Sequence, residues 1–189
     1  LMDTWVFQPG YPLISVRTEG NEVIVSQQIF RYLQDGSDLD RRWQAPIFVR
    51  AGTANGVQTQ TALLTGDELR LSLSTSPEWV IVNAGGHGFY RVRYSQDLLN
   101  RLTTNLYSDL SAVERFNLVN DTWAAAQAGL TPMTSYLELL RLFRDETDHN
   151  VWSAILGSCH YLYRLLDAPQ RPALQTFLRN LLTPIVQKL

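Results

Sequence analysis

The hydrophobic pattern of this 189-residue chain changes once, near Gln96, and this change limits the folds that it can adopt. Before Gln96, apolar and polar residues alternate, as residues 69–74 show, which is the period of a half-buried strand. After Gln96, apolar residues recur every three or four positions, which is the period of an amphipathic helix. The sequence therefore predicts a β domain over residues 1–94 and a helical domain over residues 95–189.

The β domain is expected to be a small antiparallel β-sandwich. Alternating apolar residues on both sides of the stretch "TEGN" predict a hairpin, and "LLTGDEL" joins two further alternating runs through Gly66. We expect six or seven short strands with turn residues between them, a spacing that is typical of sandwiches.

The helical domain is expected to consist of antiparallel helical hairpins. Ser111 and Glu114 form a capping-box pattern, Gly129 occupies a helix C-cap position, and Pro132 is placed at the first position of the next helix. The loops are short, so the hairpins resemble the start of an α-solenoid of the HEAT type. The expected apolar faces are Phe116, Val119 and Trp123; Met133, Tyr136, Leu137 and Leu140; Trp152, Ile155, Leu156, Cys159, Tyr163 and Leu166; and Leu174, Phe177, Leu178, Leu181 and Ile185.

Charge and composition exclude several classes of partner. Lys and Arg number 16 and Asp and Glu number 18, a net charge of -2 that argues against a nucleic-acid partner. No apolar run is long enough to span a membrane, and no signal peptide opens the chain. The single Cys159 excludes an internal disulfide and fits a reducing compartment, so we expect a cytoplasmic protein. Both ends read as if they lay inside longer elements, which predicts a fragment of a larger protein.

The stretch "WVIVNAGGHGFYRVRY", residues 79–94, contains a glycine-rich loop that invites comparison with phosphate-binding loops. Its "GGHG" matches neither the dinucleotide-binding nor the P-loop pattern. The residues after it alternate as in a strand, whereas a phosphate-binding loop leads into a helix N-terminus. We therefore interpret the loop as a turn that needs positive φ angles.

Neither a metal site nor a catalytic nucleophile is predicted from the residues themselves. Glu146 and His149 have the Glu-x-x-His spacing of di-iron bundles, but the second such pair is missing. His149 and His160 are about 16 Å apart along a helix, too far to share one ion. Cys159 lies on an apolar helix face and is expected to be inert. The acidic run around Glu146 is interpreted as a solvated helix terminus.

Three segments in order along the chain resemble the region that follows the catalytic domain in zinc aminopeptidases of the M1 family, which are aminopeptidase N-like. "LMDTWVFQPGYPLISV" resembles the start of the β-sandwich, "WVIVNAGGHGFYRVRY" its junction with the helical domain, and "ERFNLVNDTWAAAQAG" an early helix of that domain. The residues that carry the resemblance in the first two segments are Trp5, Gln8, Gly10, Pro12, Asn83, Gly88, Tyr90, Arg91, Val92 and Tyr94.

The resemblance implies a non-catalytic C-terminal segment that forms cavity wall and structural support in a parent enzyme. That parent would use zinc to remove N-terminal residues from peptides. The segment itself would carry no cofactor and would contact the upstream catalytic domain of its own chain. "YLYRLLD" is similar to a segment whose Tyr-Lys pair can contact a peptide's C-terminal carboxylate. This similarity makes Tyr163 and Arg164 the candidate substrate-binding residues, with Tyr163 on the apolar face of its helix and Arg164 beside it on a small polar face.

A second hypothesis remains open at this point. The chain could be a stand-alone interaction module, a sandwich with helical hairpins that has no connection to peptidases. In that case Arg164 would be an ordinary solvated arginine, as most arginines on helix surfaces are.

Overall fold

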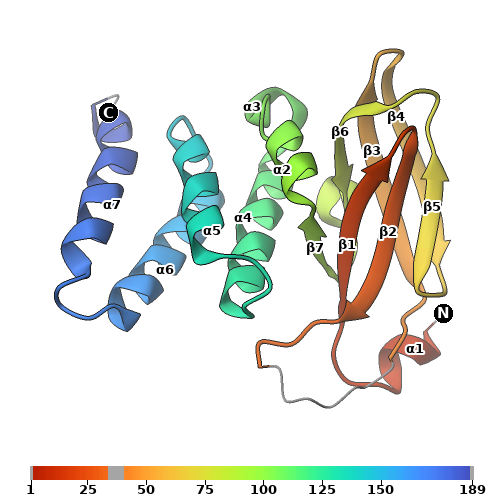
Figure 1. The fold of residues 1–189 in the computed structure, drawn as a ribbon, viewed down its shortest axis with the longest axis horizontal. Coiled ribbons are helices and arrows are strands. Elements are labelled where there is room, and N and C mark those ends of the chain that lie inside the picture. Colours follow the sequence, from red (N-terminus) through yellow and green to blue (C-terminus); the bar gives the residue numbers. More distant parts are fainter. Residues whose placement is uncertain (1, 34–40, 188–189) are drawn as a thin grey trace. The chain divides into compact units, whose positions relative to one another are not determined.

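The computed structural model of the protein describes residues 2–33 and 41–187 (Figure 1). The chain divides into two compact units, Leu1–Glu114 and Arg115–Leu189. All strands of the described residues lie in the first unit, and helices alone form the second. The predicted order of β followed by α is confirmed.

Two sheets form the body of the first unit (Figure 1). The four-stranded sheet has the order β5-β2-β1-β7, and the three-stranded sheet has the order β4-β3-β6. The strands are β1 (Pro12–Glu19), β2 (Glu22–Ile29), β3 (Ala45–Thr53), β4 (Gly56–Leu64), β5 (Glu68–Ser72), β6 (Pro77–Val82) and β7 (Arg91–Tyr94).

Strands β1 and β2 form the hairpin predicted around "TEGN". Glu19 pairs with Glu22, so Gly20 and Asn21 make a two-residue turn. Gly20 has φ +58°, a conformation that glycine adopts without the penalty of a Cβ atom. Turn chemistry and alternating burial thus agree, which is why this part was predictable.

The prediction of a wholly antiparallel sandwich is wrong at one pair of strands. β7 runs parallel to β1, with Ile14 opposite Val92. The preceding strand β6 belongs to the other sheet, so residues 83–90 carry the chain from one sheet to the other before β7 begins. Because a tight hairpin does not connect β7 to its partner, nothing forces the antiparallel direction.

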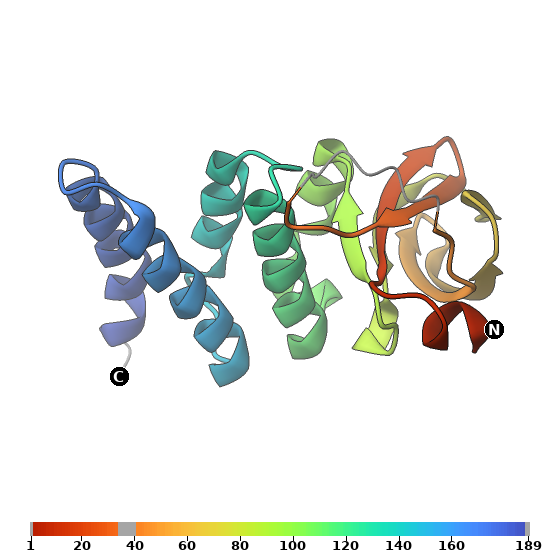
Figure 2. The ribbon, with the colours of Figure 1, turned by 90° about the horizontal axis from the view of Figure 1, so that it is seen from below.

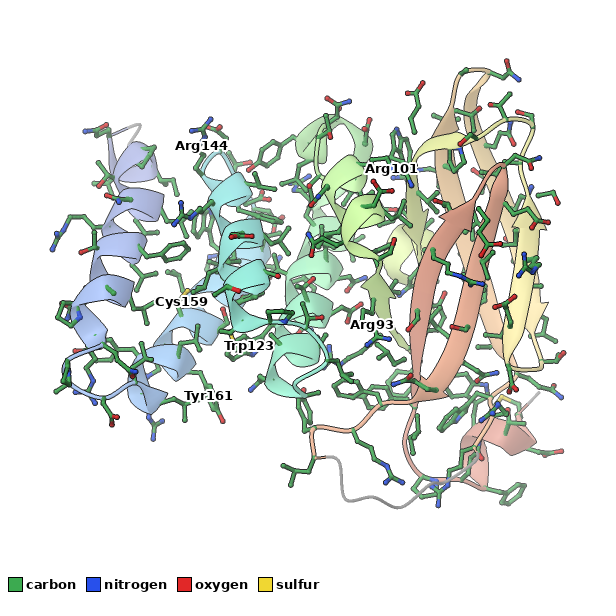
Figure 3. The ribbon with its side chains drawn as sticks, viewed as in Figure 1. Arg93, Arg101, Trp123, Arg144, Cys159 and Tyr161 are labelled. Carbon is green, nitrogen blue, oxygen red and sulfur yellow. The ribbon has the colours of Figure 1, made fainter. Side chains whose placement is uncertain are left out.

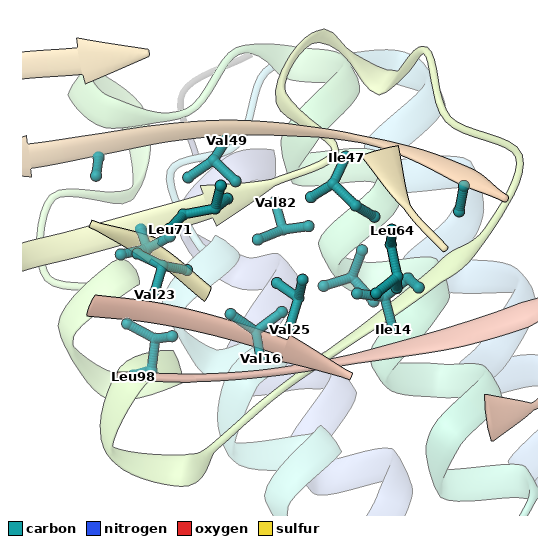
Figure 4. Close-up of a cluster of buried hydrophobic side chains, with 14 of the residues drawn as sticks. Ile14, Val16, Val23, Val25, Ile47, Val49, Leu64, Leu71, Val82 and Leu98 are labelled. Carbon is teal, nitrogen blue, oxygen red and sulfur yellow. The ribbon is translucent and has the colours of Figure 1, made fainter. Parts of the chain in front are cut away.

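A hydrophobic core lies between the two sheets (Figure 4). It combines Ile14 and Val25 of one sheet with Ile47 and Val82 of the other, and all four are buried. Leu98 also belongs to this core, although it lies on a helix beyond the last strand. The secondary structure therefore changes at residue 95, where the period changed, while the compact first unit continues to Glu114.

The crossing between β6 and β7 is fixed by side chains that the sequence resemblance had singled out. Asn83 adopts φ +65°, and its Oδ1 accepts the backbone N–H of Gly88 at 2.6 Å. The hydroxyl of Tyr94 accepts the backbone N–H of Val82 at 3.0 Å and donates to its carbonyl at 3.2 Å. A Cβ atom at Gly88 would overlap the ring of Tyr90. These contacts hold the crossing between β6 and β7.

The segment before β1 contains the short helix α1 (Asp3–Val6) and is tied to the start of β3. Trp5 Nε1 donates to the carbonyl of Gln44 at 3.0 Å. The Gln8 amide donates to the carbonyls of Thr4 and Arg42, both at 2.8 Å. The first motif therefore closes one end of the sandwich.

The helices follow the change of period that the sequence predicted near Gln96. They are α2 (Gln96–Leu102), α3 (Leu106–Asp109), α4 (Ala112–Gln127), α5 (Met133–Leu140), η2 (Arg141–Phe143), α6 (His149–Leu165) and α7 (Arg171–Val186). α6 and α7 lie side by side, as Figures 1 and 2 show. No helix in the described ranges combines the length and apolar character needed to cross a membrane.

Two of the predicted helix ends are confirmed, and one is shifted. Glu114 accepts the backbone N–H of Ser111 at 2.8 Å, which is one of the two bonds of a capping box, and the Ser111 hydroxyl donates to the same carboxylate at 2.9 Å. Gly129 has φ +70°, and the N–H of Leu130 bonds to the carbonyl of Ala125 at 2.9 Å, which closes α4 as a C-cap glycine does. Pro132 precedes the first residue of α5 as its N-cap instead of occupying that first position.

The predicted apolar face of α6 is only partly correct. Leu156 was placed on this face but is 43% exposed, and Trp152 and Tyr163 are half-buried. The buried residues are Val151, Ile155, Ser158, Cys159 and Leu162. The apolar residues of α6 span a wider arc than its contacts cover, so periodicity alone could not centre the face.

Candidate functional site

The glycine-rich loop binds a carboxylate from its own chain. The N–H of Gly85 donates to Glu114 Oε1 at 2.9 Å. Gly85 and Gly86 have φ +77° and +74°, and the 3₁₀ turn η1 (Ala84–Gly86) leads to strand β7. The interpretation as a turn is confirmed, and the anion that this loop holds is the side chain of Glu114.

Arg50 completes the surroundings of Glu114. Its two terminal nitrogens contact the two carboxylate oxygens, each at 2.9 Å, and one of them also donates to the carbonyl of Asp109 at 2.6 Å. Burial alone would raise the pKa of Glu114, but the hydrogen bonds from Arg50, Gly85 and Ser111 hold this pKa below its ordinary value. The network ties β3, η1 and the start of α4 together within the first unit.

Sequence reasoning identified Glu114 only as a helix cap and missed Arg50. Arg50 occupies an outward position between the buried Val49 and Ala51 of an alternating strand, where a polar residue is expected. No local signal distinguishes it from a solvated arginine.

The interpretation of the acidic run near residue 146 as a solvated helix terminus is wrong for Glu146. Its carboxylate is buried and paired with Arg115, with Nε–Oε2 at 2.6 Å and a second nitrogen–oxygen contact at 2.9 Å. It also accepts the backbone N–H groups of Thr147 and Asp148. Burial alone would raise its pKa, but these bonds, with Arg115 the strongest, lower it. Glu146 is therefore committed to an ion pair instead of a metal ion.

The two predicted substrate-binding residues lie near the end of α6 and have different surroundings. Tyr163 is half-buried; the guanidinium carbon of Arg171 lies 5.0 Å from its ring centroid, and the Gln175 amide donates to its hydroxyl at 3.4 Å. Arg164 is exposed, and no described residue forms an ion pair with it. The structure does not bring the two side chains to a shared ligand.

Arg164 shares an open face of α6 with small and polar residues. Ser153, Gly157 and His160 are all exposed, at the helical spacing that the sequence indicated. A Cβ atom built on Gly157 would meet no atom within 4 Å. We call Ser153, Gly157, His160 and Arg164 the open α6 face.

The described residues contain no group of three or more His, Cys, Asp or Glu side chains that could hold a metal ion. These described residues therefore do not offer the ligand set that a zinc ion needs. Cys159, which Figure 3 marks within the helical unit, is buried, and burial raises the pKa of its thiol to about 11. Its predicted position in the core is confirmed. A neutral thiol is a poor nucleophile.

A cluster of aromatic rings lies at the end of the first unit that carries α1. The ring of Phe89 contacts those of Trp5 and Tyr11 at centroid distances of 6.2 and 5.7 Å. The Arg91 guanidinium lies over Tyr11 and Phe30 at 5.9 and 5.2 Å. Phe89 is 73% exposed, whereas Phe30 is buried. We call Trp5, Tyr11, Phe30, Phe89 and Arg91 the aromatic cluster.

The fold and the junction define a β-then-α protein whose polar networks are structural. A family model described as "ERAP1-like C-terminal domain" matches residues 79–189. The chain therefore belongs to this family, and the resemblance to the C-terminal region of M1 aminopeptidases is confirmed. The matched range begins within β6. It therefore includes the glycine-rich loop, the carboxylates of Glu114 and Glu146, and the open α6 face.

Curated relatives extend the similarity to the β part. "Aminopeptidase M1-A" of Oryza sativa subsp. japonica is 27% identical over 100% of this chain and 22% of its own length. "Aminopeptidase N" of Canis lupus familiaris is 30% identical over 98% of this chain and 20% of its own length. "Puromycin-sensitive aminopeptidase" of Caenorhabditis elegans is 30% identical over 82% of this chain and 17% of its own length. The chain thus spans about a fifth of the length of these relatives.

Proposed function

We propose that this chain is the non-catalytic C-terminal part of a zinc-dependent aminopeptidase that removes N-terminal residues from peptides. The observation that carries the proposal is the similarity to aminopeptidases over the whole of this chain and only about a fifth of theirs. The polar networks of Glu114 and Glu146 support a structural role, because their carboxylates are fully engaged with arginines and backbone. Zinc would be held by residues of the parent enzyme outside this chain, in a cytoplasmic protein.

The helical unit would form the wall of the cavity that receives the peptide. In this proposal α4 to α7 are antiparallel hairpins that begin an α-solenoid, since helices are joined by connections of only a few residues. Family membership weighs against the alternative of an interaction module unrelated to peptidases.

The open α6 face would contact the C-terminal carboxylate of a bound peptide. Arg164 is exposed, has no described ion-pair partner and is flanked by the open position at Gly157. A guanidinium group can hold a carboxylate through two parallel hydrogen bonds. Tyr163 would contact the peptide from beside its carboxylate, because the Tyr163 ring already packs against Arg171.

The aromatic cluster would contact the catalytic domain that precedes this chain in the parent. Phe89 is 73% exposed, while its ring is held by contacts with Trp5 and Tyr11. Exposed aromatic groups anchored at one edge are typical of protein interfaces.

The proposal that zinc binding and catalysis lie outside this chain can be tested with the purified 189-residue chain. We expect metal analysis to find no stoichiometric zinc and an alanyl-coumarin reporter to remain uncleaved, because the described residues lack a ligand cluster. The full-length parent, measured in parallel, should hold zinc and cleave the reporter. One tightly held zinc per chain in the short protein would contradict the proposal.

The peptide contact needs the full-length parent and a matched pair of substrates. Arg164→Ala should slow cleavage of long peptides with a free C-terminal carboxylate by about 10- to 150-fold, the loss of a contact worth about 1.5–3 kcal/mol. The same peptides with amidated C-termini should be cleaved at unchanged rates. Arg179→Ala, an exposed arginine on α7, serves as control. Equal effects on acid and amide peptides would leave Arg164 as ordinary surface.

A further inference from the structure

A pocket of about 200 Å³ lies between η2 and α7 in the helical unit. It is lined by Arg141, Arg144, Phe177, Asn180 and Leu181. None of these residues belongs to the open α6 face, so the pocket is separate from the proposed peptide contact. A ligand in this pocket would therefore be independent of the proposed peptide contact at Arg164.

Local backbone geometry brings the two arginines of the pocket together. Arg141 begins the 3₁₀ helix η2 and Arg144 directly follows it, and side chains three residues apart on a 3₁₀ helix project in the same direction. Phe143 between them is fully buried and anchors η2. Figure 3 marks Arg144 at the loop that follows α5. Both arginines therefore line the same pocket.

The charge around these arginines is poorly balanced. Helix α7 contains no Asp or Glu, and its charged residues are arginines. Among the described residues, Arg141 forms no ion pair, and Arg144 has only Asp145, at 3.7 Å with both side chains at least half exposed. By contrast, Arg50 and Arg115 each hold a carboxylate through two short contacts. Two neighbouring cations without matching anions favour an anionic ligand.

Two apolar side chains and one amide form the rest of the pocket wall. The Arg141 guanidinium carbon lies 5.8 Å from the ring centroid of Phe177, and Leu181 is buried behind it. The Asn180 side chain adds an amide that can donate and accept. A volume of about 200 Å³ is below the range of drug-sized sites, which is about 300–1,000 Å³. The site suits a ligand with one charged group and a short flat body.

We propose that this pocket binds a small organic carboxylate whose apolar body packs on Phe177 and whose carboxylate lies between Arg141 and Arg144. Arg141, already positioned over the ring, would hold the carboxylate from one side. Arg144 would meet it from the other side, exchanging its long contact with Asp145 for a closer one.

The probe for this site is phenylacetate, titrated into the isotopically labelled 189-residue chain and followed by NMR. We expect saturable shifts centred on residues 141–144 and 177–181, with a Kd of about 1–10 mM. Phenylacetamide has the same shape without the charge and should bind at least about tenfold more weakly, since it loses the charge-assisted bonds. Equal binding of acid and amide would overturn the proposal.

Variants distinguish binding of phenylacetate in the pocket from nonspecific attraction to a basic surface. Arg141→Gln/Arg144→Gln should weaken phenylacetate at least about tenfold, and Arg144→Gln alone, which keeps Arg141 over Phe177, about threefold or more. Arg179→Gln removes an exposed arginine of α7 outside the pocket and should change Kd less than twofold. An equal loss in the control, or no loss in the variants, would refute the site. All three substitutions are at exposed positions, so unchanged melting should confirm folding.

Two further probes identify what the pocket selects. Inorganic phosphate should bind more weakly than phenylacetate, because it has no apolar body; tighter phosphate binding would refute the role of Phe177. N-acetylphenylalanine presents the same group at the end of a peptide bond. If phenylacetate has the lower Kd, the ligand is a free acid. If N-acetylphenylalanine has the lower Kd, the ligand is the C-terminus of a peptide. Either result supports recognition of a carboxylate.

Discussion

The two units of this protein differ in how much of each element is buried inside them. In the first unit, β3 buries six of its nine residues in a core closed by a sheet on each side. In the second, α7 buries only Leu174 and Leu181 of its sixteen residues. A strand in one of two packed sheets buries its inward side chains in the core, whereas α7 has few buried side chains. Local stability should therefore fall from the sandwich toward α7.

The main ion pairs of the two units also differ in how deeply they are buried. Glu114 is buried, but its partner Arg50 keeps 27% of its side chain exposed. Glu146 is fully buried and Arg115 nearly so, at 11%. A buried pair tolerates the loss of one partner badly, because the other charge stays without solvent or counterion. The helical unit, which has the sparser packing, thus depends more heavily on one ion pair.

The largest expected effect is therefore at the buried pair of the helical unit. Arg115→Met should lower the free energy of unfolding of this unit by about 3–5 kcal/mol, because Glu146 is then left buried and uncompensated. Urea unfolding followed by tryptophan fluorescence measures it. Adding Glu146→Leu should recover much of the loss, since no buried charge remains. If the double variant is as unstable as the single one, unpaired charge is not the cause.

Apolar truncations compare the two kinds of packing directly. Ile47→Ala in the sandwich core should cost about 2–5 kcal/mol, because the side chain is completely buried and leaves a cavity. Leu178→Ala on the half-buried side of α7 should cost clearly less, since solvent already reaches that position. Denaturant midpoints of the two variants give the comparison. A larger loss at Leu178 would reverse the proposed order of stability.

Acid should weaken both networks. Folding lowers the pKa of Glu114 and Glu146 below the ordinary value of 4.5. The stabilisation is therefore complete above that value and is lost as the pH falls through the lower, folded pKa. The free energy of unfolding should decrease below about pH 5, with at most ~1.4 kcal/mol per pH unit from each group. Glu146→Gln and Glu114→Gln should each make this slope shallower, and an unchanged slope in both would exclude these carboxylates as its source.

The smallest expected effect concerns the glycine-rich loop. Gly85→Ala should destabilise the first unit by about 1–2 kcal/mol, because alanine is strained at φ +77°. Gly66→Ala is the matched control: this glycine has no positive φ, and a Cβ atom there would meet open space. Thermal melts of both variants measure the difference. An unchanged melting temperature in Gly85→Ala would show that this position does not need glycine for its backbone conformation.

The sequence by itself determined the order of secondary structure. Alternation marked the strands and the Gly20 turn marked the first hairpin, and both depend only on near neighbours. The Ser111–Glu114 cap and Gly129 marked the ends of α4 for the same reason. Resemblance then identified the family, because the motif residues Asn83 and Tyr94 hold the junction through contacts that few other side chains could make.

Only the tertiary structure decided which polar residues meet. Arg50 and Glu114 are 64 positions apart, and Arg115 and Glu146 are 31 apart, so no local pattern connects them. The parallel direction of β7 likewise depends on which sheet receives the chain after the glycine-rich loop. The pairing of Arg141 and Arg144 around a pocket depends on the one turn of 3₁₀ helix after α5 and on the approach of α7. Hydrophobic periodicity reports which face of an element is buried, but long-range charge pairing is set by chain crossings that periodicity does not encode.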